Sequence, residues 1–463
     1  MVGVATFPIS GTADLSRVEA PVTLKAYLLC AFAAFGGIFF GYDTGWMSGV
    51  LAMPFFITQY AGIEFDYALG KPIGVDPIQF GLPSSTKSLM TSILSCGTFF
   101  GALIAGDVGD FIGRRPTIII GCVVFCVGCI LEIASANQVV LFVMGRLLSG
   151  LGVGFISAII LLYMSEVAPR RVRGALVSGY QFCITLGILL ANCVTYATAN
   201  RNDTGSYRIP VGIQFLWALI LGIGLSILCK CYPYAYPESQ NFIFYFGTTF
   251  FQQLGTMHNP FLISLVATLV NALSTPLSFW AIEKLGRRPL LICGAIRMIV
   301  SQFIVATVGV TAGRAEVANY DAVRAMIALI CIYIFFFAST WAPCFPLPIR
   351  SRGVGVSTAS NWFWNCIIGV ITPYMVGNEP GSANLGPKVF YIWGSLCFLS
   401  LAFAYFLVPE MKGLTLEQID GMMEETAPRK SGAWKPTTTF AAQMGRVRQE
   451  GSPRHEKQAM RAV

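Results

Sequence analysis

The sequence predicts an all-α membrane protein with about twelve spanning helices arranged in two similar halves. Three observations predict it: the apolar composition, the number of long apolar runs, and a charged loop motif that occurs twice. The 463-residue chain is 55% hydrophobic and only 12% charged, whereas soluble proteins carry about 25% charged residues. A soluble fold could not hide so much apolar surface, so a lipid bilayer is the expected solvent.

Long apolar runs follow one another along most of the chain. A helix needs about 20 apolar residues to cross a hydrocarbon core of about 30 Å. The candidate runs are 26–51, 88–106, 116–135, 139–163, 174–198, 211–231, 240–257, 260–282, 289–312, 325–347, 354–376 and 388–408. Residues 1–25 are mixed polar without a cleavable signal pattern, so we expect the first run to be retained as a spanning helix.

The distribution of basic residues predicts that both termini are cytoplasmic. With that orientation, the short inner loops carry more Lys and Arg than the outer loops, as in known membrane proteins. A glycosylation sequon at Asn202 then falls on an outer loop. The expected domains are a cytoplasmic segment 1–25, a six-helix bundle 26–231, a connector 232–239, a six-helix bundle 240–410 and a cytoplasmic tail 411–463.

A short charged motif occurs once in each half. It reads DFIGRRP at 110–116 and EKLGRRP at 283–289, in both cases directly after an apolar run. Glycine permits a sharp turn, and the arginines can then reach carboxylates at the cytoplasmic ends of neighbouring helices. Parallel repeats of this kind are typical of rocking transporters. The alternative is a charge cluster that only stops membrane translocation.

Further motifs give the chain a specific resemblance, which extends from about residue 20 to residue 420. They are GYDTGWMSG at 41–49, GRLLSGLGVG at 145–154, YMSEVAPRRVRG at 163–174, FPLPIRSRG at 345–353, SNWFWN at 360–365 and PEMKGLTLEQID at 409–420. With the duplicated loop, they resemble the sugar porter family of the major facilitator superfamily, and most of all fungal hexose transporters. The resemblance implies the major facilitator fold and a monosaccharide substrate, moved by facilitated diffusion or together with a proton.

The resemblance also implies a cytoplasmic gate built from the duplicated loops and from the start of two later helices. The expected gate residues are Asp110, Arg114, Arg115, Glu166, Arg173, Glu283, Arg287, Arg288 and Arg352. Ion pairs of this kind can form in one conformation and break in another.

Uncharged amides are the candidate sugar ligands. A hexose presents hydroxyl groups without net charge, and amides both donate and accept hydrogen bonds. The resemblance assigns sugar contact to Gln181, Asn241, Asn271, Asn361 and Asn365. The last two stand at i, i+4 spacing and therefore share one helix face. The alternative is that these amides join helices by hydrogen bonds.

An acid and an arginine inside apolar runs form a candidate proton-coupling pair. Asp43 lies within the first run and Arg146 near the start of the fourth. Ionisable residues in a membrane are costly and usually have a partner or mark a pathway. A purely structural ion pair is the alternative, because non-coupled fungal members of the family keep the acid too. Glycines at 97, 101, 150, 152 and 154 predict close helix contacts.

Two stretches are shorter than in the family that the chain resembles. The connector before residue 241 lacks its usual long basic segment. The run ending near 345 lacks about eight residues that in relatives carry a sugar-contacting Trp and an acid. We therefore expect Arg287, Arg288 and Arg352 to lack their acidic partner. A transport-defective copy is one alternative to an active carrier, and a glucose sensor is another.

Several classes of function are not indicated by the sequence. The chain has two histidines, and its cysteines lie mostly inside apolar runs, so we expect no metal site. No phosphate-binding loop or nucleophile–base arrangement indicates an enzyme, and no cofactor is expected. Basic residues do not form a stripe interleaved with aromatics, which argues against nucleic acid binding. The expected partners are a monosaccharide, protons if transport is coupled, and the bilayer, most simply that of the plasma membrane.

Overall fold

The computed structural model describes residues 24–67, 71–74, 80–167, 173–227, 260–312, 320–340, 351–377 and 382–410, with isolated positions between 422 and 434. The chain divides into two compact units. One unit is Leu24–Val408, which contains every helix described below, and the other combines Met1–Thr23 with Pro409–Val463.

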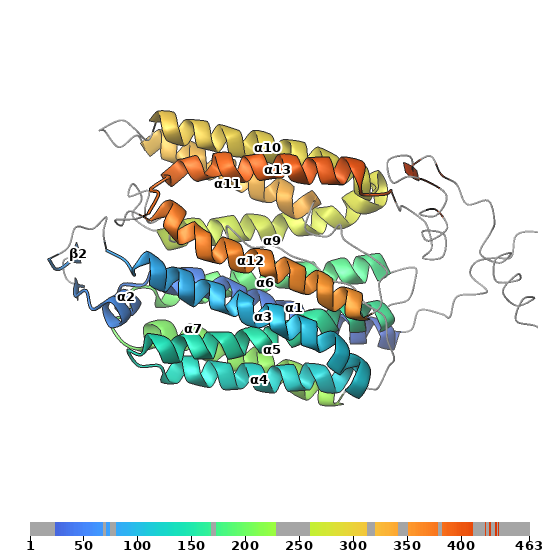
Figure 1. Ribbon diagram of the computed structural model, residues 1–463, viewed down its shortest axis with the longest axis horizontal. Helices are drawn as coiled ribbons and strands as arrows, with labels where there is room; N and C mark the ends of the chain where they lie inside the picture. The colour runs from blue at the N-terminus through green and yellow to red at the C-terminus, as the bar shows by residue number, and fades with distance from the viewer. Residues whose placement is uncertain are drawn as a thin grey trace, which may run out of the picture. The chain divides into compact units, whose positions relative to one another are not determined.

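Long α-helices make up nearly all of the first unit (Figure 1). They are α1 (Leu24–Val50), α3 (Ser84–Ile112), α4 (Arg114–Ala134), α5 (Val139–Val167), α6 (Arg173–Thr198), α7 (Gly205–Ile227), α9 (Pro260–Leu285), α10 (Arg287–Ala312), α11 (Tyr320–Thr340), α12 (Ser351–Val376) and α13 (Val389–Phe406). Among the described residues, 8 helices are long and apolar enough to cross a membrane. Each run expected to span the membrane overlaps a described helix, except 240–257, which lies outside the described residues, as do 228–231 and 341–347 at the ends of two other runs.

The connection between α1 and α3 contains structure that the apolar runs do not indicate. A short helix α2 (Pro54–Ala61) begins with proline at its first turn and ends at Gly62, whose φ is 72°. Proline is suited to a first helical turn and glycine to a left-handed end, which explains both limits. The strands β1 (Phe65–Asp66) and β2 (Lys71–Pro72) follow and pair antiparallel, with Phe65 opposite Pro72.

The duplicated motif forms the same turn in both halves. Helix α3 ends at Ile112 and α4 starts at Arg114, while α9 ends at Leu285 and α10 starts at Arg287. The single residue between each pair is a glycine with positive φ, 91° at Gly113 and 88° at Gly286. Residues with a Cβ rarely adopt this conformation. The sharp turn expected from the sequence is therefore confirmed in both copies.

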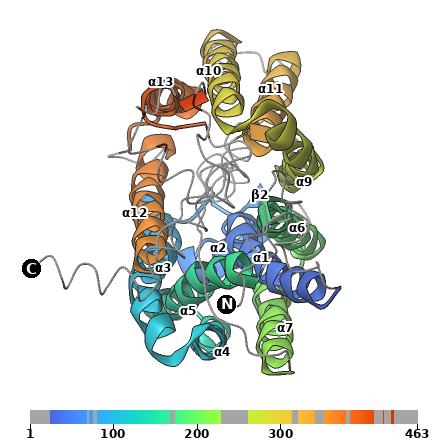
Figure 2. The same cartoon turned by 90° about the vertical axis from the view of Figure 1, so that its right-hand side faces the viewer.

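Helices of each half of the sequence pack mainly on one another. Viewed along the helices, α1 and α3 to α7 lie together, and α9, α10, α11 and α13 form a second group (Figure 2). Helix α12 of the second half instead packs along α3 and also contacts α5, and α6 of the first half packs on α9. A short 3-10 helix, η2 (Gly386–Lys388), leads into α13. The boundaries of the two expected bundles and of the connector stay predictions.

Glycines allow some helices to approach one another very closely. A Cβ at Gly97 would clash with the carbonyl oxygen of Leu147, and one at Gly101 with that of Leu151, so α3 and α5 touch backbone to backbone. Gly152 instead faces α4, near Phe125. The expected close contacts are confirmed, and they hold α3, α4 and α5 at a spacing that larger residues would not permit.

Helix α12 contributes to the core of the first group. Trp362 is fully buried, and its ring packs edge-on against Phe40 of α1, with centroids 5.6 Å apart. Nearer the other end of α12, Ser88 of α3 donates a hydrogen bond to the carbonyl of Val370 at 3.1 Å. Trp364, by contrast, is exposed. These contacts fix α12 against α1 and α3 along much of its length.

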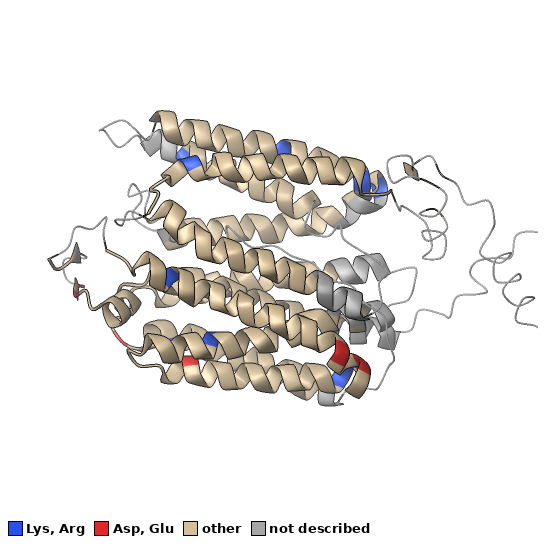
Figure 3. Cartoon of the chain, in the orientation of Figure 1, with Lys and Arg blue, Asp and Glu red and all other residues tan. Residues whose placement is uncertain are grey.

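Charged residues are sparse along the middle of the described helices and gather mainly near their ends (Figure 3). This is the distribution expected where the middle of a helix lies in hydrocarbon. The few charges inside the helices therefore need a specific explanation.

Candidate functional site

Asp43 and Arg146 meet inside the first group of helices. An Nη1 donor of Arg146 on α5 lies 3.3 Å from Oδ1 of Asp43 on α1, and both side chains are almost completely buried. The guanidinium also lies over the ring of Trp46, 5.0 Å from its centroid. The pairing expected from the sequence is therefore present, and its role in proton coupling stays a prediction.

A second carboxylate, which the sequence analysis does not single out, belongs to the same cluster. Glu132 lies near the end of α4 and is fully buried, and its Oε1 accepts a hydrogen bond of 2.8 Å from the Ser149 hydroxyl. The charge of Arg146 acts on Glu132 as well as on Asp43. The signal that could have found Glu132 is the one that found Asp43, an ionisable residue inside an apolar run.

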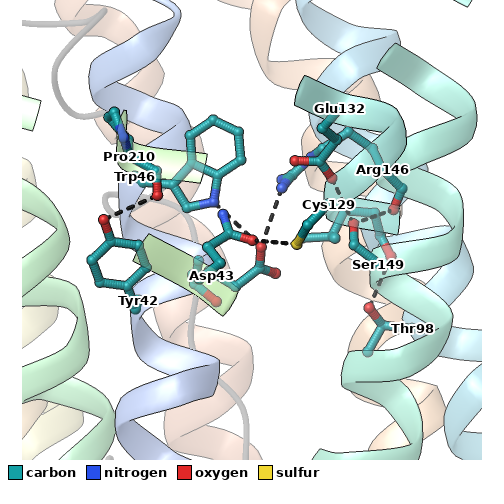
Figure 4. Close-up of polar contacts among 12 residues, drawn as sticks. Tyr42, Asp43, Trp46, Thr98, Cys129, Glu132, Arg146, Ser149 and Pro210 are labelled. Carbon is teal, nitrogen blue, oxygen red and sulfur yellow. Dashed lines mark hydrogen bonds and ion pairs between the residues drawn. The ribbon is translucent and has the colours of Figure 1, made fainter. Parts of the chain in front are cut away.

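Two polar groups of α7 contact residues of this cluster, and Figure 4 labels one of them, at Pro210. The Cys129 thiol lies 3.1 Å from Oε1 of Gln214, and the Tyr42 hydroxyl donates to the carbonyl of Pro210 at 3.1 Å. The indole nitrogen of Trp46 donates to Oδ1 of Asp43 at 3.3 Å. Charged and polar side chains from α1, α4, α5 and α7 thus meet in one buried place.

Several polar atoms of the cluster have no hydrogen-bond partner among the described residues. They are Oδ2 of Asp43, Oε2 of Glu132, Nε and Nη2 of Arg146, and Nε2 of Gln214. Buried polar groups are normally satisfied, and leaving one unpaired costs about 1–3 kcal/mol. The cluster therefore holds spare capacity to rearrange its hydrogen bonds or to bind a proton.

The central amide of α9, Asn271, lies buried in the helix interior. Asn271 is fully buried, and both its Oδ1 and its Nδ2 lack a hydrogen-bond partner in the part of the chain that is described. Gln181 on α6 is buried too. An amide with both polar atoms unsatisfied is the group that a sugar hydroxyl would complete, since it offers one donor and one acceptor.

Helix α6 packs on α9, and one hydrogen bond between them shows where Asn271 and Gln181 lie along the two helices. Ser264 of α9 donates to Oδ1 of Asn192 on α6 at 3.1 Å. Asn271 stands seven residues after Ser264 and Gln181 eleven before Asn192, so each lies on the contacting face of its helix. The helices run in opposite directions, and at about 1.5 Å per residue both amides lie about 10–16 Å from the contact.

The two asparagines of α12 share a face, as their spacing predicts. Nδ2 of Asn365 donates to Oδ1 of Asn361 at 3.3 Å, with Asn365 buried and Asn361 half-buried. Phe363, two residues from each, contacts Phe99 of α3. A step of two residues turns a helix by about 200°, so the amides point away from α3.

The duplicated turns hold their arginines in different ways. Arg114 pairs with Asp110 of its own turn at 2.6 Å. Arg288 of the second copy donates to the carbonyl of Tyr405 at 2.8 Å, and its guanidinium lies 5.6 Å from the centre of that ring. Arg288 thus contacts a backbone carbonyl and an aromatic ring at the end of α13, and the expected loss of its acidic partner stays a prediction.

Some predicted site residues lie outside the described part of the structure. They are all of Asn241 and the side chains of Glu166, Arg173, Glu283, Arg287 and Arg352. Asn202 is described and exposed, in the short connection between α6 and α7. Beside it, Arg201 and Asp203 form an exposed bidentate pair, and the hydrogen bond from Arg201 holds the pKa of Asp203 below its ordinary value. No cluster of metal-binding side chains occurs among the described residues.

The long apolar helices and the few buried charged groups among them define a polytopic membrane transport protein. The chain belongs to the family described as "Sugar (and other) transporter", which it matches over residues 29–230 and 237–423. Its fold is the all-α fold of the major facilitator superfamily. The xylose transporter XylE from E. coli shares that fold, with a TM-score of 0.66 at 21% identity, covering 85% of this chain and 100% of that one.

Relatives from fungi are more similar in sequence. The major facilitator-type transporter ecdD of Aspergillus rugulosus is 39% identical, covering 89% of this chain and 90% of that protein. The high glucose sensor RGT2 of Saccharomyces cerevisiae is 32% identical over 87% of this chain and 61% of its own length. The probable glucose transporter rco-3 of Neurospora crassa is 33% identical over 88% and 80%. The family expected from the motifs is confirmed.

Proposed function

We propose that this protein carries a monosaccharide, glucose or another hexose, across a membrane by alternating access. The observation that carries the proposal is Asn271, a buried amide whose two polar atoms lack a hydrogen-bond partner among the described residues, on a helix that packs against the helix of Gln181. Asn361, Asn365 and Asn241 complete the proposed sugar ligands. Relatives named as glucose transporters support the choice of substrate.

The proposed cytoplasmic gate consists of the two duplicated turns and the helix ends near them. Arg114 with Asp110 and Arg288 with Tyr405 are its described contacts. Glu166, Arg173, Glu283, Arg287, Arg352 and Arg115 are its further proposed members. We propose that these helix ends also form ion pairs that break and re-form as the two groups of helices rock against each other.

We expect replacement of Asn271 by alanine to weaken sugar uptake. Loss of hydrogen bonds to a buried ligand costs about 1–3 kcal/mol, so the apparent affinity should fall about five- to 150-fold. Gln181→Ala should act in the same direction. The measurement is uptake of radiolabelled glucose against concentration, in cells that lack their own hexose carriers.

Ser264→Ala is the matched control for these variants. Its hydroxyl is already bound to Asn192 between the same two helices, so its loss should affect stability and leave the apparent affinity for sugar unchanged. Wild-type kinetics in both amide variants would contradict the proposed site. No uptake by a correctly localised wild-type chain would contradict the carrier function itself.

A sensor is the second candidate, supported by the similarity to the high glucose sensor RGT2. A sensor and a carrier both bind sugar, so binding does not distinguish them. Deleting the gene separates the two functions. A change in glucose-regulated transcription with unchanged uptake indicates a sensor, and a loss of uptake indicates a carrier. A transport-defective copy is the third candidate. It is suggested by the shortened stretches near 241 and 345, which lie outside the described residues.

We further propose that the chain lies in the plasma membrane with both termini cytoplasmic and with Asn202 glycosylated on the outer side. Asn202 is exposed in a short connection, as an acceptor asparagine must be. Asn202→Gln should therefore increase the electrophoretic mobility of protein made in a glycosylating host, as glycosidase treatment of the wild type should. Equal mobility of all three samples would contradict this orientation or the modification.

A further inference from the structure

Glu132 is a buried acid that has no role in the sugar transport proposed above. It lies near the end of α4, its side chain is completely buried, and its one recorded hydrogen bond comes from the neutral hydroxyl of Ser149. The second oxygen, Oε2, has no partner among the described residues. An ionised carboxylate in such a place would be poorly compensated, because burial disfavours charge.

The charges around Glu132 do not balance unless one acid is protonated. Among the described residues, the charged groups that act on Glu132 are Arg146 of α5 and Asp43 of α1, and Cys129 lies near it on α4 as a neutral thiol. One cation therefore faces two carboxyl groups in a buried cluster. With both acids ionised the cluster would carry a net negative charge in the membrane interior, which is strongly unfavourable. One proton restores neutrality.

The hydrogen bonds distinguish the two acids. Oδ1 of Asp43 accepts from two N–H donors, the charged Nη1 of Arg146 and the indole of Trp46. Among the described residues, the Glu132 side chain accepts a hydrogen bond from the Ser149 hydroxyl alone. Charge-assisted hydrogen bonds favour the ionised form of their acceptor. We propose that, in this conformation, Asp43 is ionised and paired with Arg146 while Glu132 holds a proton on Oε2.

In this arrangement the cluster binds one proton, and the position of the Arg146 side chain decides whether Glu132 or Asp43 holds it. If Arg146 turned its unpaired Nη2 or Nε toward Glu132, that acid would release its proton and Asp43 would take one up, with the net charge unchanged. The proton site rests on the geometry of the cluster alone. Its use in moving a sugar rests in addition on the proposed transport function.

Infrared spectroscopy of the purified full-length protein tests the proton site directly. A protonated buried carboxyl group gives a C=O stretching band that a carboxylate lacks. We expect this band in the wild type at neutral pH, and we expect it to shift when glutamate carries a ¹³C carboxyl label supplied by cell-free synthesis. An aspartate label should leave the band in place.

Substitutions of the two acids test this charge balance through their effect on the infrared band. Glu132→Gln keeps an acceptor for Ser149 and should remove the band. Asp43→Asn should remove it as well, because the remaining acid then pairs one to one with Arg146 and ionises. Glu64→Gln, the same change at an exposed acid, is the matched control and should leave the band unchanged. Size-exclusion chromatography of each variant verifies that it is folded.

Three results would overturn the proposal: no such band in the wild type at neutral pH, a band that moves with the aspartate label, or a band that survives in Glu132→Gln. These outcomes are independent of sugar transport. A wild-type chain that shows the glutamate band and moves no sugar would keep the proton site and contradict the carrier function. A chain that moves sugar without the band would do the reverse.

Discussion

Replacing Arg146 with methionine should lower the free energy of unfolding by about 3–5 kcal/mol, the usual cost of removing one partner of a buried ion pair. Arg146 is completely buried, pairs with Asp43, and is the cation that acts on Glu132. Without it, two acids remain in an apolar interior with no positive charge to compensate them. The measurement is the thermal or denaturant midpoint of purified protein in detergent.

The same substitution at an exposed pair is the control. Arg201 contacts Asp203 at 2.7 Å, closer than Arg146 contacts Asp43. The side chains of Arg201 and Asp203 are, however, each about half exposed. Exposed pairs contribute little, because water and salt already screen their charges. Arg201→Met should therefore leave the midpoint essentially unchanged. Equal midpoints for the two variants would contradict the assigned role of Arg146.

Removing the acids together with the arginine should restore part of the lost stability. In the triple variant Asp43→Asn, Glu132→Gln, Arg146→Met, no uncompensated charge remains, and neutral replacements of buried ion clusters are often tolerated. Arg146→Met alone should therefore be less stable than the triple variant. The opposite order would indicate that packing of the long side chain over Trp46, rather than its charge, stabilises this region.

Replacing Gly101 with valine should be the second strongly destabilising change, at about 3 kcal/mol. A Cβ at Gly101 would clash with the carbonyl oxygen of Leu151 and would lie 3.1 Å from the Cα of Gly154. These are backbone atoms, so relief requires α3 and α5 to move apart rather than one side chain to rotate. Overpacking of this kind typically costs about 1–3 kcal/mol, and contact between two backbones places Gly101 at the upper end.

Gly212→Val is the matched control, because a Cβ at Gly212 meets nothing within 4 Å. Both glycines lie inside helices, so the intrinsic effect of glycine and valine on the helix is the same at both sites. The difference between the two variants isolates the helix contact. It can be followed as the monodisperse fraction and the melting temperature of each purified variant. Similar values for both would show that α3 and α5 do not need this close approach.

The sequence by itself determined the long apolar helices and the two duplicated turns. Apolar runs of spanning length fix where helices form in lipid, because every backbone polar group must be satisfied within its own segment. A glycine between two helices fixes a turn with positive φ, as at Gly113 and Gly286. The i, i+4 spacing of Asn361 and Asn365 likewise fixes a shared face, because the period of an α-helix is local. The pairing of Asp43 with Arg146 could be anticipated, since two buried charges of opposite sign need each other.

Only the tertiary structure decided which residues from distant helices share a site. Nothing local in the sequence shows that Glu132 faces Ser149 and Arg146, because that depends on how α4 and α5 are rotated about their axes. Arg288 donates to the backbone carbonyl of Tyr405, and a backbone partner cannot be predicted from residue type because every residue has a carbonyl. Asn271 lacks hydrogen-bond partners among the described residues because no polar group of a neighbouring helix there reaches its amide, and this too depends on helix packing. Spacing along one helix is set by the chain, whereas contacts between helices are set by packing over the whole bundle.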